Sequence, residues 1–280
     1  MRTIDITTEN FEEYMDVLPE EHLDDIGRQY CRALVGVNPE TDETCAAMFW
    51  EIRNVERKDS DITAEIYWYK ADDEDDGQEL LKSFDVICDY DQVKTSFFEL
   101  EKLTDPEIIS FTNQGFAIKN TEGINVFVTV EELCGLGIAK KAPKKYVHSL
   151  SDISTLQFKQ GVMNCVFHGK YGLLDDLPFL PKNRFDPDIS CCVLIDGMVS
   201  GFLLVHRMRQ GCYCVELLCS DKLDAAVNIL NMLRYSIRAA GDLCNPTDKV
   251  LLRMHSRSVT DIVKKLFPGK KGSKVFRGIK

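Results

Sequence analysis

Cysteine is the residue type in this chain with the most evident capacity for chemistry. The chain has eleven cysteines. Five of them lie close together in its second half, at Cys191, Cys192, Cys212, Cys214 and Cys219. A zinc site needs four converging ligands, often supplied by C-x-x-C pairs, and this spacing contains no such pair. The five histidines show no ligand spacing either. We therefore expect these cysteines to be small buried residues, and we expect no metal site.

Acidic residues crowd two loops that precede predicted helices. The first loop is the run Asp72–Asp76, which is followed by Gly77. The second loop contains Asp221 and Asp224 on either side of Lys222. Carboxylates stabilise helix N-termini by their charge and by capping unpaired N–H groups, so a structural role explains both loops. A ligand role is the alternative, and it depends on the elements around the loops.

The elements around the two loops occur in the same order twice. The first copy is predicted as strands at 30–37, 44–53 and 62–70, a helix behind 72–76, a strand at 95–100 and a helix opened by Asp105-Pro106. The second copy is predicted as strands at 189–195, 199–208 and 212–219, a helix over 224–240 capped by Gly241, a strand at 249–254 and a helix over 259–266. Asp196-Gly197 predicts a tight hairpin in the second copy. Each copy then leaves through a glycine, Gly115 or Gly269. Such self-similarity indicates a duplicated domain.

This order of elements resembles the GNAT superfamily of acetyl-CoA-dependent N-acetyltransferases. The resemblance covers most of the chain. It implies an α/β (α+β) fold of two tandem GNAT-like domains, each a mixed, mostly antiparallel sheet flanked by helices. We expect these domains at residues 1–135 and 150–280, joined by a linker at 136–149.

In that family the third strand separates from its neighbour so that pantetheine can insert. The next loop, with the pattern R/Q-x-x-G-x-G/A, wraps the pyrophosphate with backbone N–H groups. In the first copy this pattern falls on Asp72, Asp75 and Gly77, and only Gly77 fits. Like charges about 5 Å apart cost roughly 1 to 3 kcal/mol per pair, so we predict that the first domain is noncatalytic.

In the second copy the pattern falls on Asp221, Asp224 and Ala226, and only Ala226 fits. This loop is better suited to an anion than the first loop, because Lys222 adds a positive charge and the Ser220 hydroxyl can donate a hydrogen bond. The resemblance therefore implies an acetyl-CoA site in the second domain, held by Leu217, Leu218, Cys219, Ser220, Lys222, Asp224, Ala225 and Ala226.

The resemblance also suggests a general base for the incoming amine. Glu65 resembles the strand glutamate that acts as the base in some family members, and Glu216 holds a similar strand position in the second copy. A solvated or ion-paired glutamate is the alternative for both. The family often has a tyrosine acid four residues before the exit glycine, and that position holds Phe111 in one copy and Lys265 in the other. The identity of the acid stays open.

Charge is divided unevenly along the chain. Residues 1–135 carry a net charge of −22, and residues 136–280 carry +11. Opposite signs predict docking of the acidic half on the basic half, and an anionic ligand such as coenzyme A is the alternative for the basic half. We expect no nucleic-acid partner, because the acidic half would repel it and the basic residues are not interleaved with aromatic ones.

The hydropathy and the cysteine content of the chain indicate the cellular compartment in which we expect it. No apolar run reaches 18 residues and the first residues lack a signal-like stretch, so we predict a cytoplasmic protein without membrane contact. An odd number of cysteines fits reduced thiols. The basic segment 264–280 contains a strand-like run at 274–277, which we expect to be a solvated terminal strand.

Together these features predict an N-acyltransferase that moves an acetyl group from acetyl-CoA to an unidentified small-molecule or peptide amine. Any active site is expected in the second domain. The alternative is a catalytically inactive GNAT-like binding or scaffolding protein, because neither loop keeps its glycines.

Overall fold

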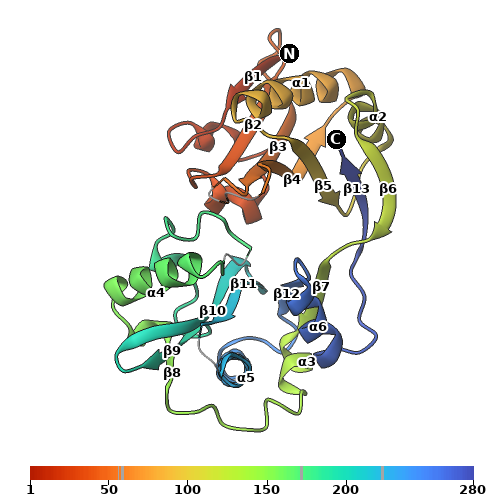
Figure 1. Cartoon of the computed structure of the whole chain (residues 1–280). Coiled ribbons are helices and arrows are strands. Elements are labelled where there is room, and N and C mark those ends of the chain that lie inside the picture. The colour runs from red at the N-terminus through yellow and green to blue at the C-terminus, as the bar shows by residue number, and fades with distance from the viewer. Residues whose placement is uncertain (56, 58–59, 171–172, 222–223) are drawn as a thin grey trace. The chain divides into compact units, whose positions relative to one another are not determined.

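The chain divides into two compact units. The computed structural model describes residues 1–55, 57, 60–170, 173–221 and 224–280. Unit 1 comprises Met1–Gly123 and Ser273–Lys280, and unit 2 comprises Ile124–Gly272 (Figure 1). The segment 136–149, which the sequence analysis assigned to a linker, lies inside unit 2, where Leu136 and Tyr146 pack against the apolar core. The chain passes between the units at 123–124 and again at 272–273.

Unit 1 is built on a seven-stranded sheet with the order β1-β2-β3-β4-β5-β13-β6. The strands are β1 (Arg2–Asp5), β2 (Cys31–Val37), β3 (Thr44–Arg53), β4 (Thr63–Ala71), β5 (Thr95–Leu100), β6 (Ala117–Glu122) and β13 (Lys274–Ile279). Helices α1 (Glu74–Tyr90) and α2 (Asp105–Asn113) pack against the sheet through one apolar cluster. The 3₁₀ helices η1 (Phe11–Tyr14) and η2 (Glu20–Asp25) contribute to a second cluster. Only β4 and β5 pair in parallel.

Unit 2 is built on a six-stranded sheet with the order β7-β12-β11-β10-β9-β8. The strands are β7 (Asn125–Thr129), β8 (Val147–Ser149), β9 (Cys191–Ile195), β10 (Met198–Arg209), β11 (Cys212–Ser220) and β12 (Lys249–Arg253). Helix α4 (Thr155–Phe167) and η3 (Leu150–Asp152) contribute side chains to one core cluster. The 3₁₀ helix η4 (Lys182–Arg184) packs against α4. Helices α3 (Val130–Cys134), α5 (Ala225–Leu243) and α6 (Arg257–Leu266) pack on the other core cluster. Only β11 and β12 pair in parallel.

Strand β13 is an interior strand of unit 1, although it follows all of unit 2 in the sequence. It pairs with β5 on one side and with β6 on the other. Val275 is 1% exposed, and the ring of Phe98 lies directly against Gly278. The expectation of a solvated terminal strand at 274–277 is therefore wrong. The apolar residues of this short basic run complete a sheet whose first strand begins at Arg2, 272 residues before Lys274.

The expected fold class is confirmed, since each unit is a mixed sheet flanked by helices. The hairpin at Asp196 and Gly197 is also confirmed, with φ of 52° and 77° as the two central positions of such a turn require. Gly241 is not a cap, because α5 continues to Leu243. A Cβ at Gly241 would lie 2.8 Å from the Cys134 Sγ, so this glycine allows α3 to approach α5. Among the helices of the described residues, none is both long and apolar enough to span a bilayer.

Candidate functional site

Both sheets open at the same place in the element order. In unit 1 the parallel pairing of β4 with β5 runs from Thr63 to Ile66 and then stops. In unit 2 the pairing of β11 with β12 runs from Cys212 to Cys214 and then stops. More than half of β4 and of β11 thus lies beyond the last residue that pairs with the parallel neighbour. This is the opening that the family resemblance implies for pantetheine.

A β-bulge marks the start of each opening. In unit 1 the register skips Tyr67, and in unit 2 it skips Glu216. A bulge turns two successive side chains toward one face, and bulges are common next to active sites. Counted from the bulges, Glu65 corresponds to Cys214 and not to Glu216. The two glutamates were expected to hold similar positions, and they are two residues apart.

The opening of unit 1 is filled by its own side chains. The ring of Phe111 from α2 lies 4.5 Å from the ring of Tyr69 and 4.3 Å from that of Phe98, centroid to centroid. The backbone N–H of Ala71 donates to the Glu107 carboxylate at 3.2 Å, and Glu107 is buried. An inserted pantetheine arm would have to displace this packing and this hydrogen bond.

The acidic loop of unit 1 caps its own helix. The Asp73 side chain accepts from the backbone N–H of Asp76 at 2.9 Å, as an N-cap residue does. Gly77 is the one residue that fits the phosphate-loop pattern, and it serves helix packing. A Cβ there would lie 2.5 Å from the Ser110 Oγ and 2.7 Å from the Tyr69 hydroxyl.

Glu65 belongs to a buried chain of ion pairs in unit 1. Its carboxylate lies 2.6 Å from Arg53 Nε, and Arg53 Nη2 lies 2.9 Å from Glu51. Glu51 also pairs with Arg28 at 2.9 Å, and Arg28 pairs with Asp25 at 2.8 Å. These contacts support the ion-paired alternative for Glu65, because a base held by a guanidinium at this distance is poorly placed to take a proton from an amine.

Glu216 lies on the α4 face of unit 2 in a different setting. It is 6% exposed, and its Oε1 lies 3.8 Å from the Arg184 Nη2, a longer and weaker contact than those of Glu65. The Arg184 carbonyl accepts from His206 Nδ1 at 3.1 Å. The Glu216 carbonyl accepts from the Leu173 N–H at 2.9 Å. Arg184 thus contacts the Glu216 carboxylate, His206 of β10 holds the backbone of Arg184, and Leu173 holds the backbone of Glu216.

A groove of about 590 Å³ is lined in part by the residues on either side of Arg184. Its walls come from the start of α4 and from the segment that leads into β9: Ser151, Thr155, Lys159, Phe179, Pro181, Lys182, Asn183, Phe185 and Pro187. Asn183 and Phe185 flank Arg184 in the sequence. Lys159 is anchored by donating to the carbonyls of Pro178 and Leu180 at 3.0 and 2.6 Å. The groove therefore has a fixed wall next to the residue that contacts Glu216.

Helix α5 begins differently from its counterpart in unit 1. Its N-cap residue, Asp224, has φ of −90° and ψ of 30° and makes no side-chain cap hydrogen bond. Ala225 and Ala226 form its first turn and offer no carboxylate. Lys222 lies outside the described residues. The N–H groups at this end are thus not capped by the side chain that would ordinarily cap them.

A buried polar cluster lies behind the start of α5. The Ser220 hydroxyl donates to the Ser200 carbonyl at 3.3 Å and accepts from Asn228 Nδ2 at 3.1 Å. The backbone N–H of Asp221 donates to the same carbonyl at 3.0 Å. Asn164 from α4 holds the Asp221 carboxylate at 3.1 Å. These bonds fix the loop entrance and turn Asp221 toward α4.

The remaining predicted residues lie along β11 toward this loop. Leu217 and Cys219 are buried in the α4-side cluster, and Leu218 packs with the α5-side cluster. All three pair with β10 on one side, at Leu204, Leu203 and Phe202. Glu216 and residues 217–220 thus lie on the same strand, β11. Glu65, the other predicted base, lies on β4 in unit 1.

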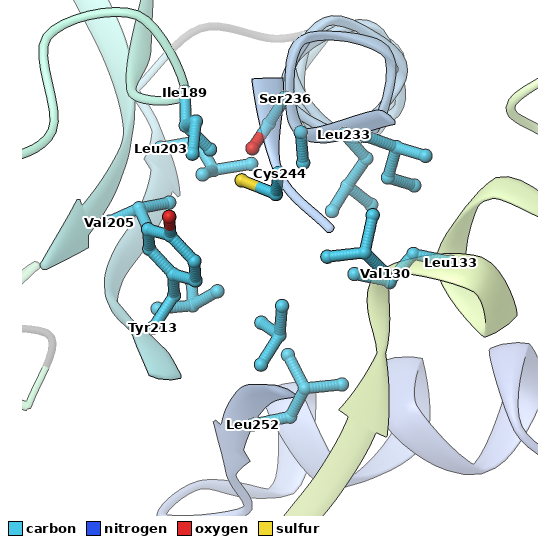
Figure 2. A pocket seen from close by; sticks show the side chains of 14 residues that line it. Val130, Leu133, Ile189, Leu203, Val205, Tyr213, Leu233, Ser236, Cys244 and Leu252 are labelled. Carbon is cyan, nitrogen blue, oxygen red and sulfur yellow. The ribbon is translucent and has the colours of Figure 1, made fainter. Parts of the chain in front are cut away.

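An apolar cavity lies on the opposite face of the unit 2 sheet. It has a volume of about 50 Å³ and is lined by side chains of the sheet, α3, α5 and Ile189, with Tyr213, Ser236 and Cys244 as its polar groups (Figure 2). Burial raises the pKa of both the Tyr213 hydroxyl and the Cys244 thiol. Such a lining suits a small apolar group and offers nothing to a phosphate. Within the part of the chain that the structure describes, no cluster of three or more metal-ligating side chains occurs.

Sequence reasoning missed Arg184, His206 and Asn228. They come from η4, β10 and α5, and their sequence neighbours carry no motif. The proline-rich run at 177–187 was the only sequence signal near them. The contact between Arg184 and Glu216 lies at the β-bulge of β11, which a strand pattern does not reveal.

Comparison with known proteins identifies the fold. No family model and no curated protein sequence matches the chain. The structure is similar to the tandem GNAT protein from the clavulanic acid biosynthesis pathway, with a TM-score of 0.60, 9% identity and coverage of 100% of this chain and 98% of that one. It is also similar to a GCN5-related N-acetyltransferase from Sphaerobacter thermophilus, with a TM-score of 0.51, 10% identity and coverage of 97% and 84%. A conserved protein of unknown function from Enterococcus faecalis V583 gives a TM-score of 0.51, 10% identity and coverage of 99% and 72%. At these identities the likeness shows the fold alone.

Proposed function

We propose that this chain, which has the tandem GNAT fold, transfers an acyl group from a coenzyme A thioester to an amine, and that unit 2 carries the reaction. Acetyl-CoA is the simplest donor. The observation that carries the choice of unit is the start of α5, which has no side-chain cap, whereas Asp73 caps α1. Uncapped N–H groups at the start of a long helix are suited to phosphate oxygens.

The residues of unit 2 fit the donor through their backbone more than through their charges. The N–H groups of Ala225 and Ala226 would face the pyrophosphate, and the polar cluster at Ser220 would hold the loop in place. Residues 217–219 lie beyond the last pairing with β12, where the pantetheine amides would bond to the strand. Unit 1 offers neither feature, because Asp73 caps α1, and Phe111 and Glu107 fill the opening of the sheet.

Glu216 is the residue that we propose as the base. The amine nitrogen bonds to the acyl carbon as the carbon–sulfur bond breaks, and Glu216 would accept the proton that the nitrogen loses. Arg184 would position the carboxylate, and the groove beside Asn183 and Phe185 would receive the amine. No side chain is assigned as the acid that protonates the thiolate.

Binding of acetyl-CoA tests the donor site. At a hundredfold excess over Kd the ligand should stabilise unit 2 by about 2.7 kcal/mol and raise the midpoint of its thermal unfolding. Asp224→Asn keeps the size of the side chain and removes a charge at the helix start. We expect it to lower Kd roughly fivefold, since a like-charge contact at a surface costs about 1 kcal/mol.

Asp75→Asn in the first turn of α1 is the matched control, and it should leave Kd unchanged. If both substitutions lowered Kd equally, the effect would come from the net charge of the protein and not from a site at the start of α5. If millimolar acetyl-CoA shifts neither the wild type nor Asp224→Asn, the transferase proposal is wrong.

Acyl transfer itself tests the base. Glu216→Gln should lower kcat by roughly 10²-fold or more, because it removes a positioned proton acceptor. The assay is release of the coenzyme A thiol with a panel of small primary amines and lysine-containing peptides. Glu65→Gln changes an equally buried strand glutamate in unit 1, and it should leave kcat unchanged. Equal losses in the two variants would contradict the assignment of the reaction to unit 2.

A noncatalytic binding protein is the second candidate. It is favoured by the contacts that already engage Glu216, namely Arg184 at its carboxylate and Leu173 at its carbonyl. In that case the groove beside α4 is a binding surface, and acetyl-CoA gives neither a thermal shift nor turnover.

A further inference from the structure

Two buried thiols from distant parts of unit 2 meet at the end of β11, where the chain leaves Ser220 and enters the loop before α5, here called the donor loop. The Sγ atoms of Cys165 and Cys219 lie 3.3 Å apart. Cys165 belongs to the last turn of α4 and Cys219 to β11, 54 residues later. Both side chains are buried, and each is a free thiol. A disulfide bond has an S–S length of about 2.05 Å, so the two sulfur atoms need to approach by only a little more than 1 Å.

The surrounding contacts hold the two elements at this distance. Asn164, the residue before Cys165, bonds to Asp221, two residues after Cys219, at 3.1 Å. A Cβ at Gly161 would lie 2.8 Å from the Phe202 ring, so α4 packs tightly on β10. Phe202 is in turn the ladder partner of Cys219. These contacts hold α4 close to β10 and β11 at the position of the two thiols.

The pair also has an asymmetry that suits thiol oxidation. The hydrogen bond from the Cys165 thiol lowers the pKa of Cys219, and the same contact raises the pKa of Cys165. The positive charge of Lys170 lowers the pKa of both thiols, and the negative charge of Asp221 raises the pKa of both. A thiolate with a protonated thiol beside it is the arrangement in which one cysteine is oxidised and the other resolves it.

We infer that Cys165 and Cys219 are a modification site, a reversible disulfide that cross-links helix α4 to strand β11 next to the donor loop. With hydrogen peroxide as the oxidant, the Cys219 thiolate attacks one oxygen, the O–O bond breaks, and a sulfenic acid and hydroxide form. The Cys165 sulfur then attacks the Cys219 sulfur and the S–O bond breaks. The Cys165 proton leaves with the hydroxyl group as water. This inference does not depend on acyl transfer.

Two other buried cysteines of this region, Cys191 and Cys192, are arranged differently. Cys191 and Cys192 are consecutive in β9 and enter opposite core clusters, so they face away from each other. Cys192 lies in the same cluster as Cys165 and Cys219. It is thus a matched control for burial without a thiol partner at bonding distance.

Peptide mapping of the intact folded chain tests the inference. The protein is treated with limited hydrogen peroxide, blocked with N-ethylmaleimide in denaturant and digested. We expect the first oxidised product to be a cross-linked peptide pair containing Cys165 and Cys219, with the loss of two hydrogen atoms. Dithiothreitol should restore both thiols. Recovery of both residues as maleimide adducts while other cysteines oxidise would overturn the inference, as would sulfinic acid on Cys219 without the cross-link.

Variants and stability provide a second measurement. Cys165→Ala and Cys219→Ala should each abolish the cross-link, and Cys192→Ala should retain it. In the wild type, oxidation should raise the thermal unfolding midpoint of unit 2 by roughly 5 to 10 °C, because the bond closes a long loop in the unfolded chain. An unchanged midpoint despite a mapped bond would show that the native geometry is strained by it and would contradict a site built for the disulfide. If the alanine variants do not fold, the wild-type map alone decides.

Discussion

Replacing Gly278 with alanine is expected to lower the free energy of unfolding of unit 1 by about 3 kcal/mol, near the upper end of the usual cost of overpacking a core. The added methyl group would overlap the ring of Phe98. That ring cannot move aside, since it is fully buried and lies 4.3 Å from Phe111 and 5.6 Å from Phe116. Denaturant unfolding followed by tryptophan fluorescence measures the change, because both tryptophans of the chain, Trp50 and Trp68, lie in unit 1.

Gly137→Ala is the matched control for this experiment. Gly137 lies in unit 2, and a Cβ there would meet no atom within 4 Å. It should leave the tryptophan transition unchanged. A Gly278→Ala variant with the wild-type transition would mean that β13 is not an interior strand of this sheet.

Arg53→Met is expected to destabilise unit 1 by about 3 to 5 kcal/mol, the usual cost of removing one partner from a buried ion pair. Methionine fills much of the same volume but leaves Glu51 and Glu65 directly opposite each other on β3 and β4. Arg28 would still pair with Glu51, so the cost falls mainly on Glu65. The same tryptophan transition reports the loss.

Arg2→Met provides the comparison for a surface pair. Arg2 and Asp42 lie 3.2 Å apart, and their side chains are 62% and 84% exposed. Exposed pairs contribute about 0 to 1 kcal/mol, so this variant should resemble the wild type. Similar transitions for Arg53→Met and Arg2→Met would contradict the view that the chain of ion pairs is structural.

The sequence was most informative where the pattern is local. The meander strands and the long helices were predicted within a few residues, because each carries its own apolar period and turn signals. Helix α4 was missed because its outward face carries Leu156, Met163 and Phe167, which blurs the amphipathic pattern. The place of β13 could not be predicted, since nothing in a strand's own residues states which sheet it joins.

The candidate site was predictable only along one strand. Residues 216–220 are consecutive, so the prediction of strand β11 fixed the order of all of them along the sheet. The bulge at Glu216 depends on the pairing with β10, and the contact with Arg184 depends on a loop that folds back over the sheet. The difference between the capped α1 and the uncapped α5 also escaped prediction, because both loops contain aspartates and only the backbone conformation separates them.

The interior position of β13 has a consequence for how the protein is made. A ribosome releases residues 1–123 long before residues 274–279, and domains ordinarily begin to fold in that order. Until β13 arrives, β5 and β6 each lack their shared neighbour, and unit 1 exposes two unpaired strand edges. All of unit 2 is synthesised between β6 and β13. The nascent chain is therefore most prone to aggregate through the unpaired edges of β5 and β6. A truncated product that ends at residue 272 would contain all of unit 2 and would still lack the strand that completes the sheet of unit 1.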